Sequence, residues 1–588
     1  MLSLKYILFV LLLLSSNPLI SAKENKMKQQ PLNLQRLLNE TLARGENKLT
    51  LSKGRYKIPT TIELNKIRSF TIDGNGATLL IPPTGELMSF FNIDDITIKN
   101  LTVDCDPLPY TQGTITNISK NFRKFEYKVH PGYPTLERFA KEFKVIGRNG
   151  IFVFNPENNR WRQDVPDLYP SDSTMISPTT GQFLFKHVFP GYRNVRVGDY
   201  VAFKNMRGNS FLFKDCGNIT MEDVTVNTGP GAGFLMRTCY GAVLMKRCKI
   251  ERGSKPVGAT HERLLSTVAD GFNLAYSRKG VVMEDCEFSN MGDDSVNLHG
   301  TFMEIGAVEN DKSIIIARPW SLEPTYQIQK GDLIRILDGK SFAMISEAKL
   351  VKMDTIDPPS PLDEKLRKHW KVPAHGKIFY IRFELDREVK AKIGNKVEVP
   401  AIACPNFVFR NNYFHDHRAR GLRIGASYGI IENNRFERIK STPISLGPHA
   451  IHNEGGWVRD ITVRNNTITE SCFDERTINK GAANAAAIVI QHFLHDDHIP
   501  YVQENRKVEI LNNTIDQIGG AAVVVTSADG VSIRENRISN TQMLNCDKVG
   551  TKIRLSNEAA ININHSKNVI IEKNHFGKKG TFCRMDTK

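Results

Sequence analysis

Short segments in which apolar and polar residues alternate fill most of the chain, and they recur at a regular spacing. Uninterrupted spacings are 22 to 25 residues, as from Asn412 to Asn434 and from Asn513 to Asn536. Each segment has Asn, Asp or Cys at a turn and an apolar residue two places later, without a helical period. The segments are ITIKNLTV (96–103), ITMEDVTV (219–226), AVLMKRCKI (242–250), VVMEDCEF (281–288), FVFRNNYF (407–414), GIIENNRF (429–436), ITVRNNTI (461–468), VEILNNTI (508–515), VSIRENRI (531–538) and VIIEKNHF (569–576). This pattern predicts an all-β fold, a right-handed parallel β-helix with one repeat per coil.

The residues at the recurrent turn are expected to have a structural role. Stacked coils would bring the asparagines into a hydrogen-bonded ladder, and we infer no chemistry for them. Cys248 and Cys286 occupy equivalent repeat positions. They suggest stacked, small buried residues, while a disulfide between them is the less favoured alternative.

Two segments, 107–203 and 301–403, interrupt the repeat with longer alternating strands and more Pro and Trp. VGDYVAF (197–203) resembles KGDLIRI (330–336), each expected to precede a return to the β-helix, so we interpret the segments as related β-barrel-like insertions. The second begins directly after His299-Gly300. The predicted order is a signal peptide (1–22), cap and first coils (23–106), first insertion (107–203), coils (204–300), second insertion (301–403) and C-terminal coils (404–588).

The N-terminus predicts export. Lys5 precedes an apolar run from Tyr6 to Leu14, and Ser21-Ala22 forms a small-residue cleavage zone. The protein is therefore expected to be secreted or periplasmic. Downstream, Leu34, Leu37, Leu38 and Leu42 fall on one helical face, which would cover the open end of the solenoid.

Composition narrows the functional classes. A chain of 588 residues with 40% hydrophobic and 24% charged residues is folded and large enough for several domains or an elongated solenoid. The net charge of +16 is spread along the chain without a nucleic-acid-binding motif, so no nucleic-acid partner is expected. No later segment has 18 consecutive apolar residues, so no membrane span is expected. Nine cysteines without a CxxC pair argue against structural zinc or a disulfide framework. Oligomeric state stays open.

One stretch of the repeat carries three carboxylates. DGFNLA (270–275) aligns with DSVNLH (294–299), 24 residues later, so Asp270 and Asp294 share one column and Asp293 lies beside Asp294. Adjacent coils are ~4.8 Å apart, as in any sheet. Carboxylates that are so near to one another resist joint ionisation. A cluster with this electrostatic cost more often indicates a functional site than a purely structural role.

Polar side chains concentrate around these carboxylates. The outward column reads Leu235, Asn273, Asn297, Arg423 and Ser445, and fades to Val489 and Val524. The next outward column carries Arg237 and His299. We therefore predict a groove for a sugar, with Asn273, Asn297, His299, Arg237 and Arg423 as substrate-binding candidates. Each of them could instead satisfy a neighbouring turn, and Trp457 could either stack on a sugar or pack in the core.

Two other interpretations of the cluster stay open from the residues alone. An Asp at a β-helix turn often caps backbone N–H groups, as Gly292-Asp293 suggests. Clustered carboxylates also bind calcium, and a calcium-dependent polysaccharide lyase would use Arg237 or Arg423 as its base. A non-catalytic glycan-binding β-helix is the third alternative.

The motifs resemble those of known glycosidases. An Asp, then a Gly-Asp-Asp on the next coil, then His-Gly resembles the polygalacturonase-type hydrolases with a pectin-lyase-like β-helix. Their other signatures are only partly echoed by His299-Gly300. The whole mature chain more closely resembles glycoside hydrolase family 110, the bacterial α-1,3-galactosidases. The resemblance is carried by SFTIDGNGATLL (69–80), ADGFN (269–273), MGDDSVNLHG (291–300) and the two insertions.

The resemblance implies an inverting exo-hydrolase that removes terminal α-1,3-linked galactose, from blood-group-B-type or linear glycans. It implies Asp293 as the general acid, with Asp270 and Asp294 activating the water. Two adjacent anions would raise the pKa of a third carboxyl, as an acid requires. Inversion typically needs ~6.5–9.5 Å between the carboxyl groups and retention about 5–5.5 Å. Neither a metal nor an organic cofactor is expected.

Overall fold

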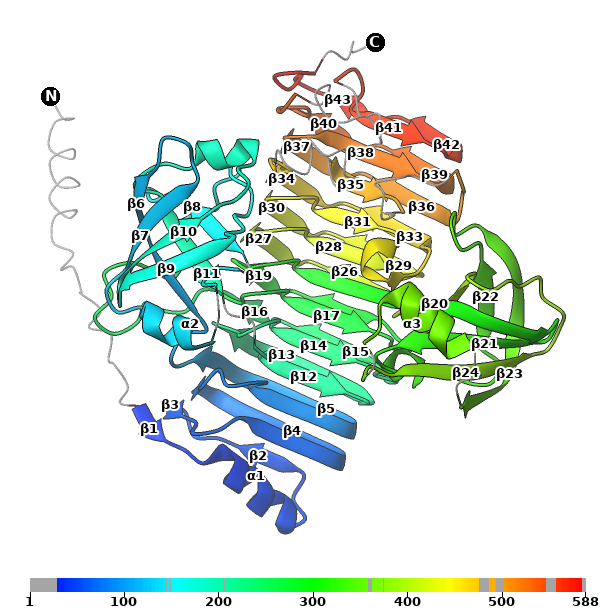
Figure 1. The fold of residues 1–588 in the computed structure, drawn as a ribbon, viewed down its shortest axis with the longest axis horizontal. Coiled ribbons are helices and arrows are strands. Elements are labelled where there is room, and N and C mark those ends of the chain that lie inside the picture. The colour runs from blue at the N-terminus through cyan, green and yellow to red at the C-terminus, as the bar shows by residue number, and fades with distance from the viewer. Residues whose placement is uncertain are drawn as a thin grey trace, which may run out of the picture.

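The computed structural model describes residues 29–583 except 143–144, 149, 205–206, 358–361, 374, 475–485, 493–500 and 546–556. The expected signal peptide (1–22) lies outside the described residues. Within them the fold-class prediction is confirmed, because the chain winds into a parallel β-helix whose coils stack from one end of the molecule to the other (Figure 1). No helix in this part of the chain is long and apolar enough to cross a bilayer.

Three stacks of parallel strands form the walls of the β-helix. The first stack contains β12 (Phe211–Lys214), β14 (Phe234–Arg237), β17 (Phe272–Ala275), β20 (Val296–Asn310), β28 (Leu422–Gly425), β31 (Ile444–Leu446), β35 (Ala486–Ile490), β38 (Ala521–Thr526) and β41 (Ile561–Asn564). The second contains β13 (Asn218–Val226), β15 (Val243–Lys246), β18 (Val281–Glu284), β26 (Phe407–Arg410), β29 (Gly429–Glu432), β33 (Arg459–Arg464), β36 (Asn505–Leu511), β39 (Ala528–Arg534) and β42 (Lys567–Glu572). The third contains β16 (Lys249–Ile250), β19 (Glu287–Ser289), β27 (Tyr413–His417), β30 (Arg435–Ile439), β34 (Thr467–Ser471), β37 (Thr514–Ile518), β40 (Arg537–Ser539) and β43 (His575–Phe576). The inward apolar columns of all three walls make one continuous core.

The N-terminal end is covered by a helix. Strands β1 (Gln29–Pro31), β2 (Lys48–Thr50), β3 (Arg55–Lys57), β4 (Ile62–Ile81) and β5 (Met88–Cys105) form the first coils. Helix α1 (Leu34–Ala43) lies at this end (Figure 1), and it buries Leu34 and Leu38 in the main core. The apolar stripe of the helix thus shields the first coil from water.

The predicted asparagine ladder is present at the turns of the C-terminal coils. Each buried Asn side chain donates to the next Asn and to a backbone carbonyl, and its own oxygen accepts from a backbone N–H of the preceding coil. The ladder runs through Asn412, Asn434, Asn466, Asn513, Asn536 and Asn574. It satisfies polar groups that the coils bury. Cys248 and Cys286 stack as free thiols, as favoured from the repeat, and the Cys248 N–H donates to Cys286 Sγ at 3.3 Å.

The first insertion is an antiparallel sheet with its own core. Its strands pair in the order β8 (Ile151–Phe154), β11 (Tyr200–Lys204), β6 (Tyr110–Ile118), β7 (Lys124–Val129), β10 (Thr180–Leu184) and β9 (Asp172–Ser177). Helix α2 (Leu136–Glu142) and the short η1 (Pro190–Asn194) complete it. Its core also takes in Ala259, Leu264, Leu265 and Val268 from the segment that leads to Asp270.

The second insertion is a closed antiparallel barrel that grows out of β20. Its strands pair in a ring of β20, β21 (Ser313–Pro319), β24 (Ile378–Leu385), β23 (Met344–Ile356), β22 (Leu333–Leu337) and β25 (Lys396–Glu398). The ring is accompanied by η2 (Glu323–Thr325), α3 (Leu362–Trp370) and η3 (Pro400–Ile402). KGDLIRI (330–336) forms most of β22, and three more strands follow before the chain returns to the β-helix. The expected match to VGDYVAF at the return point is therefore wrong, because β11 ends its insertion and β22 does not.

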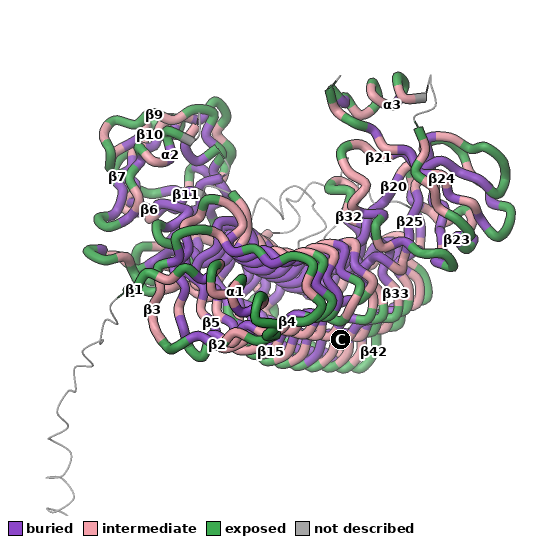
Figure 2. Tube along the Cα trace, turned by 90° about the horizontal axis from the view of Figure 1, so that it is seen from below, coloured by how far each residue is buried: buried purple, intermediate pink, exposed green. Residues whose placement is uncertain are grey.

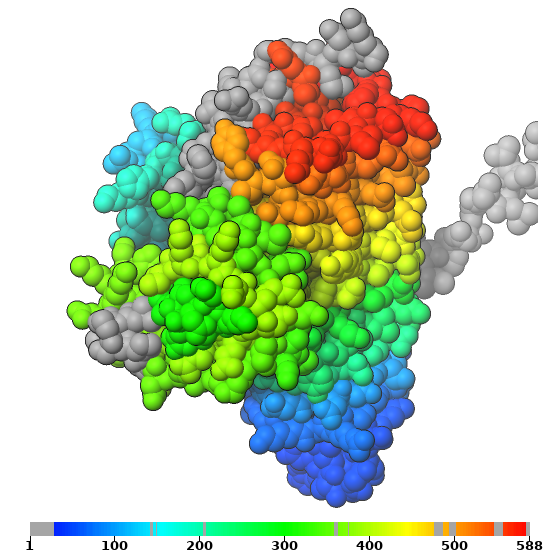
Figure 3. Space-filling view, turned by 90° about the vertical axis from the view of Figure 1, so that its right-hand side faces the viewer, coloured from blue at the N-terminus to red at the C-terminus, as the bar shows by residue number. Residues whose placement is uncertain are grey.

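Both insertions stand on the same side of the β-helix. Figure 2 shows them rising left and right of the solenoid, and Figure 1 shows the first stack of strands between them. In Figure 3 the coils form bands from the N-terminal to the C-terminal end, and the second insertion protrudes from the middle bands. The face between the insertions is the one that carries the predicted carboxylates.

Candidate functional site

The strand register places the candidate residues in the columns expected from the alignment of coils. Asn273 pairs with Asn297, Asn297 with Arg423, and Arg423 with Ser445. Ala275 separates Arg237 from His299 in the neighbouring column. The inward neighbours Phe272, Val296 and Leu422 are fully buried. Apolar packing inside the coil therefore holds a row of polar side chains on its outer face.

The three aspartates converge. One oxygen atom of each of Asp270, Asp293 and Asp294 lies within 4.8 Å of the others. Asp294 is almost fully buried, whereas the Asp293 side chain is 32% exposed. Asp270 precedes β17 and Asp294 precedes β20, so the stacking of these two strands brings the carboxylates together.

Arginines that the sequence analysis did not name neutralise two of these carboxylates. The Arg420 backbone N–H and Nε donate to Asp294 Oδ1 at 2.8 and 2.9 Å, and its Nη2 donates to Oδ2 at 2.9 Å. Arg418 Nη1 lies 2.8 Å from Asp293 Oδ1. Arg423 Nη1 lies 3.9 Å from Asp294 Oδ2, and Arg423 Nη2 pairs with Glu454 Oε2.

The surroundings of the aspartates raise the pKa of Asp270 and lower the pKa of Asp294. Burial, followed by the charges of Asp293 and Asp294, raises the pKa of Asp270 to about 8, against the opposing hydrogen bond from Asn273. Burial also opposes ionisation of Asp294, but Arg420 and Arg423 overcome it and lower the pKa of that carboxyl. Around the site, Asp270, Asp293, Asp294 and Glu454 face Arg418, Arg420 and Arg423. One proton on Asp270 balances this set of charges.

The other candidates supply neutral hydrogen-bonding groups. Asn273 Nδ2 donates to Asp270 Oδ2 at 2.7 Å, and Asn273 Oδ1 accepts from Arg237 Nη1 at 2.8 Å. Asn297 is 3% exposed, and its Oδ1 makes no hydrogen bond within the described residues. A buried acceptor without a partner is costly, so a ligand donor at this position would be favourable.

His299 is a second neutral acceptor. Burial lowers the pKa of His299 to about 4, with Arg237 and Arg423 contributing and Glu454 opposing. Its Nδ1 lies 2.8 Å from the Gly300 carbonyl oxygen, which can only accept, so Nδ1 carries the hydrogen. Nε2 is therefore the unprotonated nitrogen, able to accept from a hydroxyl group.

Trp457, left open between sugar stacking and the core, packs in the core. It is 2% exposed, its Nε1 donates to the Phe342 carbonyl at 3.1 Å, and it joins the cluster of Phe302, Leu337, Phe342 and Val502. This cluster fastens the second insertion to the β-helix.

The site residues that were not predicted from the sequence differ in whether the repeat contains a signal for them. Arg420 aligns with Asp294 when RGLRIG (420–425) is placed under DSVNLH (294–299), so the repeat contained that signal. Glu454 lies in β32 (Glu454–Gly455), after η4 (Ala450–His452), and reaches the site by pairing with Thr301. Arg418 and its partner Asp167, from the first insertion, have no periodic signal.

The donor set also bears on metal binding. By distance alone the three aspartates could hold a divalent cation, which prefers carboxylate oxygens. Both oxygens of Asp294 already accept from Arg420, and Asp293 faces Arg418. The guanidinium groups of Arg420 and Arg418 thus already neutralise Asp294 and Asp293, as a bound cation would.

Comparison with known proteins gives similarity over most of the chain. No family model matches. Alpha-1,3-galactosidase B of Bacteroides thetaiotaomicron is 23% identical over 496 residues, covering 81% of this chain and 74% of the relative. Alpha-1,3-galactosidase A of Bacteroides fragilis is 21% identical over 552 residues, covering 87% and 84%. Alpha-1,3-galactosidase A of Shewanella woodyi is 21% identical over 540 residues, covering 88% and 80%.

Solved structures give a weaker likeness. The mannuronan C-5 epimerase AlgE4 A-module of Azotobacter vinelandii has a TM-score of 0.38 and 9% identity, over 92% of this chain and 94% of the epimerase. The catalytic domain of a GH87 alpha-1,3-glucanase has a TM-score of 0.35 and 10% identity, over 95% and 70%. The parallel β-helix is assigned from the strand pairings. By sequence, as its motifs indicate, the chain resembles the bacterial α-1,3-galactosidases over more than four fifths of its length.

Proposed function

We propose that the protein is an exo-acting glycoside hydrolase that removes terminal α-1,3-linked galactose, from blood-group-B-type or linear glycans. The observation that carries the proposal is the convergence of Asp270, Asp293 and Asp294, one of which keeps a proton near neutral pH. Glycoside hydrolysis needs one carboxylic acid and one carboxylate around the scissile bond. The similarity to α-1,3-galactosidases supports the choice of sugar and linkage.

The neighbouring groups suit a sugar with hydroxyls on several sides. Asn297 Oδ1 and His299 Nε2 offer acceptors, while Arg237 and Asn273 bind each other beside Asp270. Within the described residues Asn297 Oδ1 has no hydrogen-bond partner, so a hydroxyl donor would satisfy it. In this proposal these groups orient the galactose, and the proton transfers belong to the aspartates.

The acid is assigned by two different arguments. The resemblance implies Asp293 as acid, with Asp270 and Asp294 activating water, and that assignment stays a prediction. The charge pattern favours Asp270 as the second candidate, because its pKa is raised to about 8 whereas Asp293 is ion-paired with Arg418. Asp294 suits the base in both schemes, since its arginine partners keep it ionised.

Leaving-group dependence separates these candidates. Replacing the acid slows substrates with poor leaving groups but spares α-galactosyl fluoride, whose departing fluoride needs no proton. We measure Asp270→Asn and Asp293→Asn on the fluoride and on an α-1,3-galactobiose. The variant that keeps fluoride hydrolysis lacks the acid, and loss of both activities in one variant indicates that its residue activates water.

The stereochemical course is proposed to be inversion. Asp294, with both oxygens bound by Arg420, is poorly placed to become a nucleophile. The oxygen separations within 4.8 Å are nevertheless shorter than the ~6.5–9.5 Å typical of inverting pairs, and this observation favours retention as the alternative. Proton NMR of the first-formed galactose decides: β-galactose supports inversion, and α-galactose supports retention.

The same assay tests the reaction class. We expect galactose release from α-1,3-galactosides, unaffected by a calcium chelator. Unsaturated uronate products that require calcium would instead identify a polysaccharide lyase. Glycan binding without turnover would indicate a non-catalytic β-helix and would contradict the proposal.

A further inference from the structure

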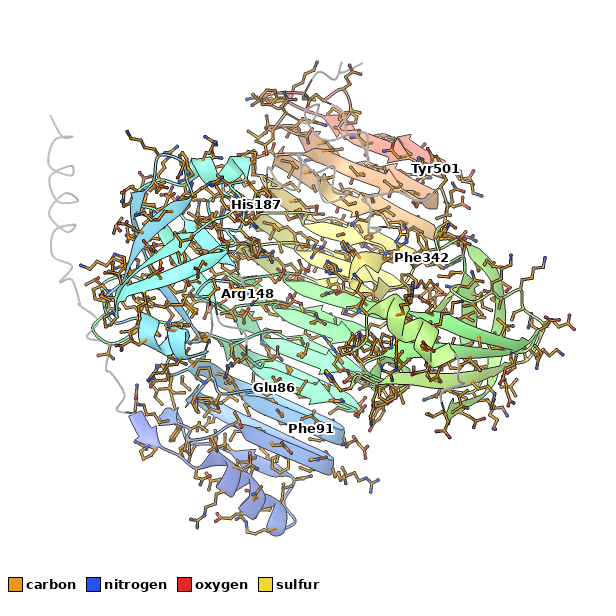
Figure 4. All side chains as sticks on the ribbon, in the orientation of Figure 1. Glu86, Phe91, Arg148, His187, Phe342 and Tyr501 are labelled. Carbon is orange, nitrogen blue, oxygen red and sulfur yellow. The ribbon has the colours of Figure 1, made fainter. Side chains whose placement is uncertain are left out.

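A second feature of the molecule is a cavity where the second insertion meets the β-helix. Its volume is about 890 Å³, within the ~300–1,000 Å³ common for small-molecule sites. Its lining includes Phe302, Arg318, Trp320, Lys340, Trp370 and Asn453. Figure 4 labels Phe342, another lining residue, at this junction.

The cavity adjoins the carboxylate site along two chain segments. Thr301, paired with Glu454 in the sheet, is followed by Phe302 in the cavity wall. Glu454 is preceded by Asn453, whose Nδ2 donates to Thr301 Oγ1 at 3.1 Å. Glu454 in turn pairs with Arg423, which lies 3.9 Å from Asp294. The wall of the cavity is therefore connected through Thr301, Asn453 and Glu454 to the residues around the aspartates.

The lining combines an aromatic face with fixed polar groups. Trp320 is 61% exposed, although it is a large apolar side chain at the end of a barrel strand. Arg318 Nη1 donates to Thr301 Oγ1 at 3.3 Å, and its Nε donates to the Ser321 carbonyl at 3.2 Å. Among the described residues, no carboxylate lies within ion-pairing distance of Arg318. Glu304 is held by Lys396 at 2.6 Å.

This combination fits a saccharide. A sugar ring has an apolar face that packs on an indole, and its rim of hydroxyls bonds to fixed donors and acceptors. An apolar ligand would form no hydrogen bonds with Arg318 and Glu304, and a simple anion would not pack on the Trp320 indole. The position of the cavity next to the residues around the aspartates favours, among saccharides, one that also reaches the aspartates.

We propose that this cavity binds the sugar units on the reducing side of the terminal galactose, with Trp320 as the stacking platform. The cavity then determines which galactosides are cleaved well, and its assignment rests on the proposed function. The galactose occupies the aspartate site, and the departing saccharide occupies the cavity. Short galactosides without these sugars make no contact there.

Kinetics with two substrates test the proposal. We compare α-galactosyl fluoride, which carries only fluoride on the reducing side of the galactose, with the trisaccharide Galα1,3-Galβ1,4-GlcNAc for the wild type and Trp320→Ala. We expect kcat/KM for the trisaccharide to fall about fivefold to tenfold, the order of one aromatic contact, and kcat/KM for the fluoride to be unaffected. The control is Tyr501→Ala, which removes a 78% exposed aromatic that is not among the residues lining the cavity. Equal losses on both substrates, or no loss on either, overturn the proposal.

A binding measurement separates this proposal from the proposed function. Saturation-transfer NMR with N-acetyllactosamine, the saccharide left after cleavage, requires no catalysis. We expect binding to the wild type and to Tyr501→Ala, and loss of signal with Trp320→Ala. If neither galactoside is hydrolysed but this pattern holds, the galactosidase assignment fails and the cavity assignment stands. Absence of binding to the wild type overturns the cavity assignment.

Discussion

The two insertions reach the aspartates by different means. The first sends in a charged side chain: Asp167 Oδ2 accepts from Arg418 Nε at 2.7 Å, and Arg418 pairs with Asp293. It also packs on the segment that leads to Asp270. The second is a continuation of the site, because β20 carries Asn297 and His299 before it enters the barrel at Phe302.

This difference predicts different consequences when each is disturbed. The first insertion influences the charge and position of one carboxylate through a short relay. The second docks through a hydrophobic cluster and the buried Glu398 carboxylate, and it forms part of the wall of the cavity. The first is therefore expected to affect chemistry, and the second to affect stability and substrate length.

The largest loss of stability is expected from a substitution in the β-helix itself, which carries both insertions. Arg420→Met leaves Asp294 buried without its main partner, which is expected to lower the free energy of unfolding by about 3–5 kcal/mol. Chemical denaturation measures it. The control Arg247→Met removes two surface ion pairs, to Glu222 and Asp223, and should lower the free energy of unfolding far less. Similar losses for both variants would contradict the importance given to Arg420.

A smaller loss of stability is expected at the docking of the second insertion. Glu398 of β25 is buried, and its Oε1 accepts from the Trp457 backbone N–H at 2.9 Å. Glu398→Ala leaves that donor unsatisfied and should cost about 1–3 kcal/mol in thermal unfolding, while aryl galactoside hydrolysis below the transition persists. Glu347→Ala, an exposed carboxylate on the same barrel, is the control. Loss of hydrolysis without loss of stability would contradict the expectation that the second insertion affects stability and the first affects chemistry.

The relay from the first insertion should affect catalysis. Asp167→Asn keeps the shape but removes the charge that holds Arg418, so kcat is expected to fall about tenfold through misplacement of Asp293. Asp164→Asn, an exposed ion-pair partner of Arg162 in the same insertion, should leave kcat unchanged. A KM effect without a kcat effect would assign Asp167 to substrate binding instead.

The smallest change concerns pH. The pKa of Asp270 is raised to about 8, so kcat/KM is expected to change as pH rises through about 8: it falls if Asp270 is the acid, because the proton is lost, and it rises if Asp270 activates water. The folded state holds this proton where the unfolded chain has lost it, between about pH 4 and 8. Through Asp270 alone, rising pH therefore lowers the free energy of unfolding across that window. In Asp293→Asn, carbon-13 NMR should find the Asp270 titration at lower pH, since one neighbouring anion is gone. An unchanged titration would show that Asp293 does not influence it.

Periodic features were predictable from the sequence, and features built by loops were not. The columns of Asn273, Asn297 and Arg423 follow from a repeat that packing forces into register. Arg420 was contained in the same alignment, although its role as partner of Asp294 needs the structure. Asp167 and Glu454 come from an insertion and a loop, whose approach depends on tertiary packing that leaves no period in the chain.

Because β20 is continuous, it also fixes the distance between the aspartate site and the cavity. His299 belongs to the aspartate site and Glu304 to the cavity, and five residues of extended chain separate them by ~16 Å. Because a strand alternates its faces every residue, only changes of two residues would move the cavity while keeping the same side chains directed into it. The distance between the aspartate site and the cavity is thereby set by the backbone of β20, and side-chain substitutions alone would not change it.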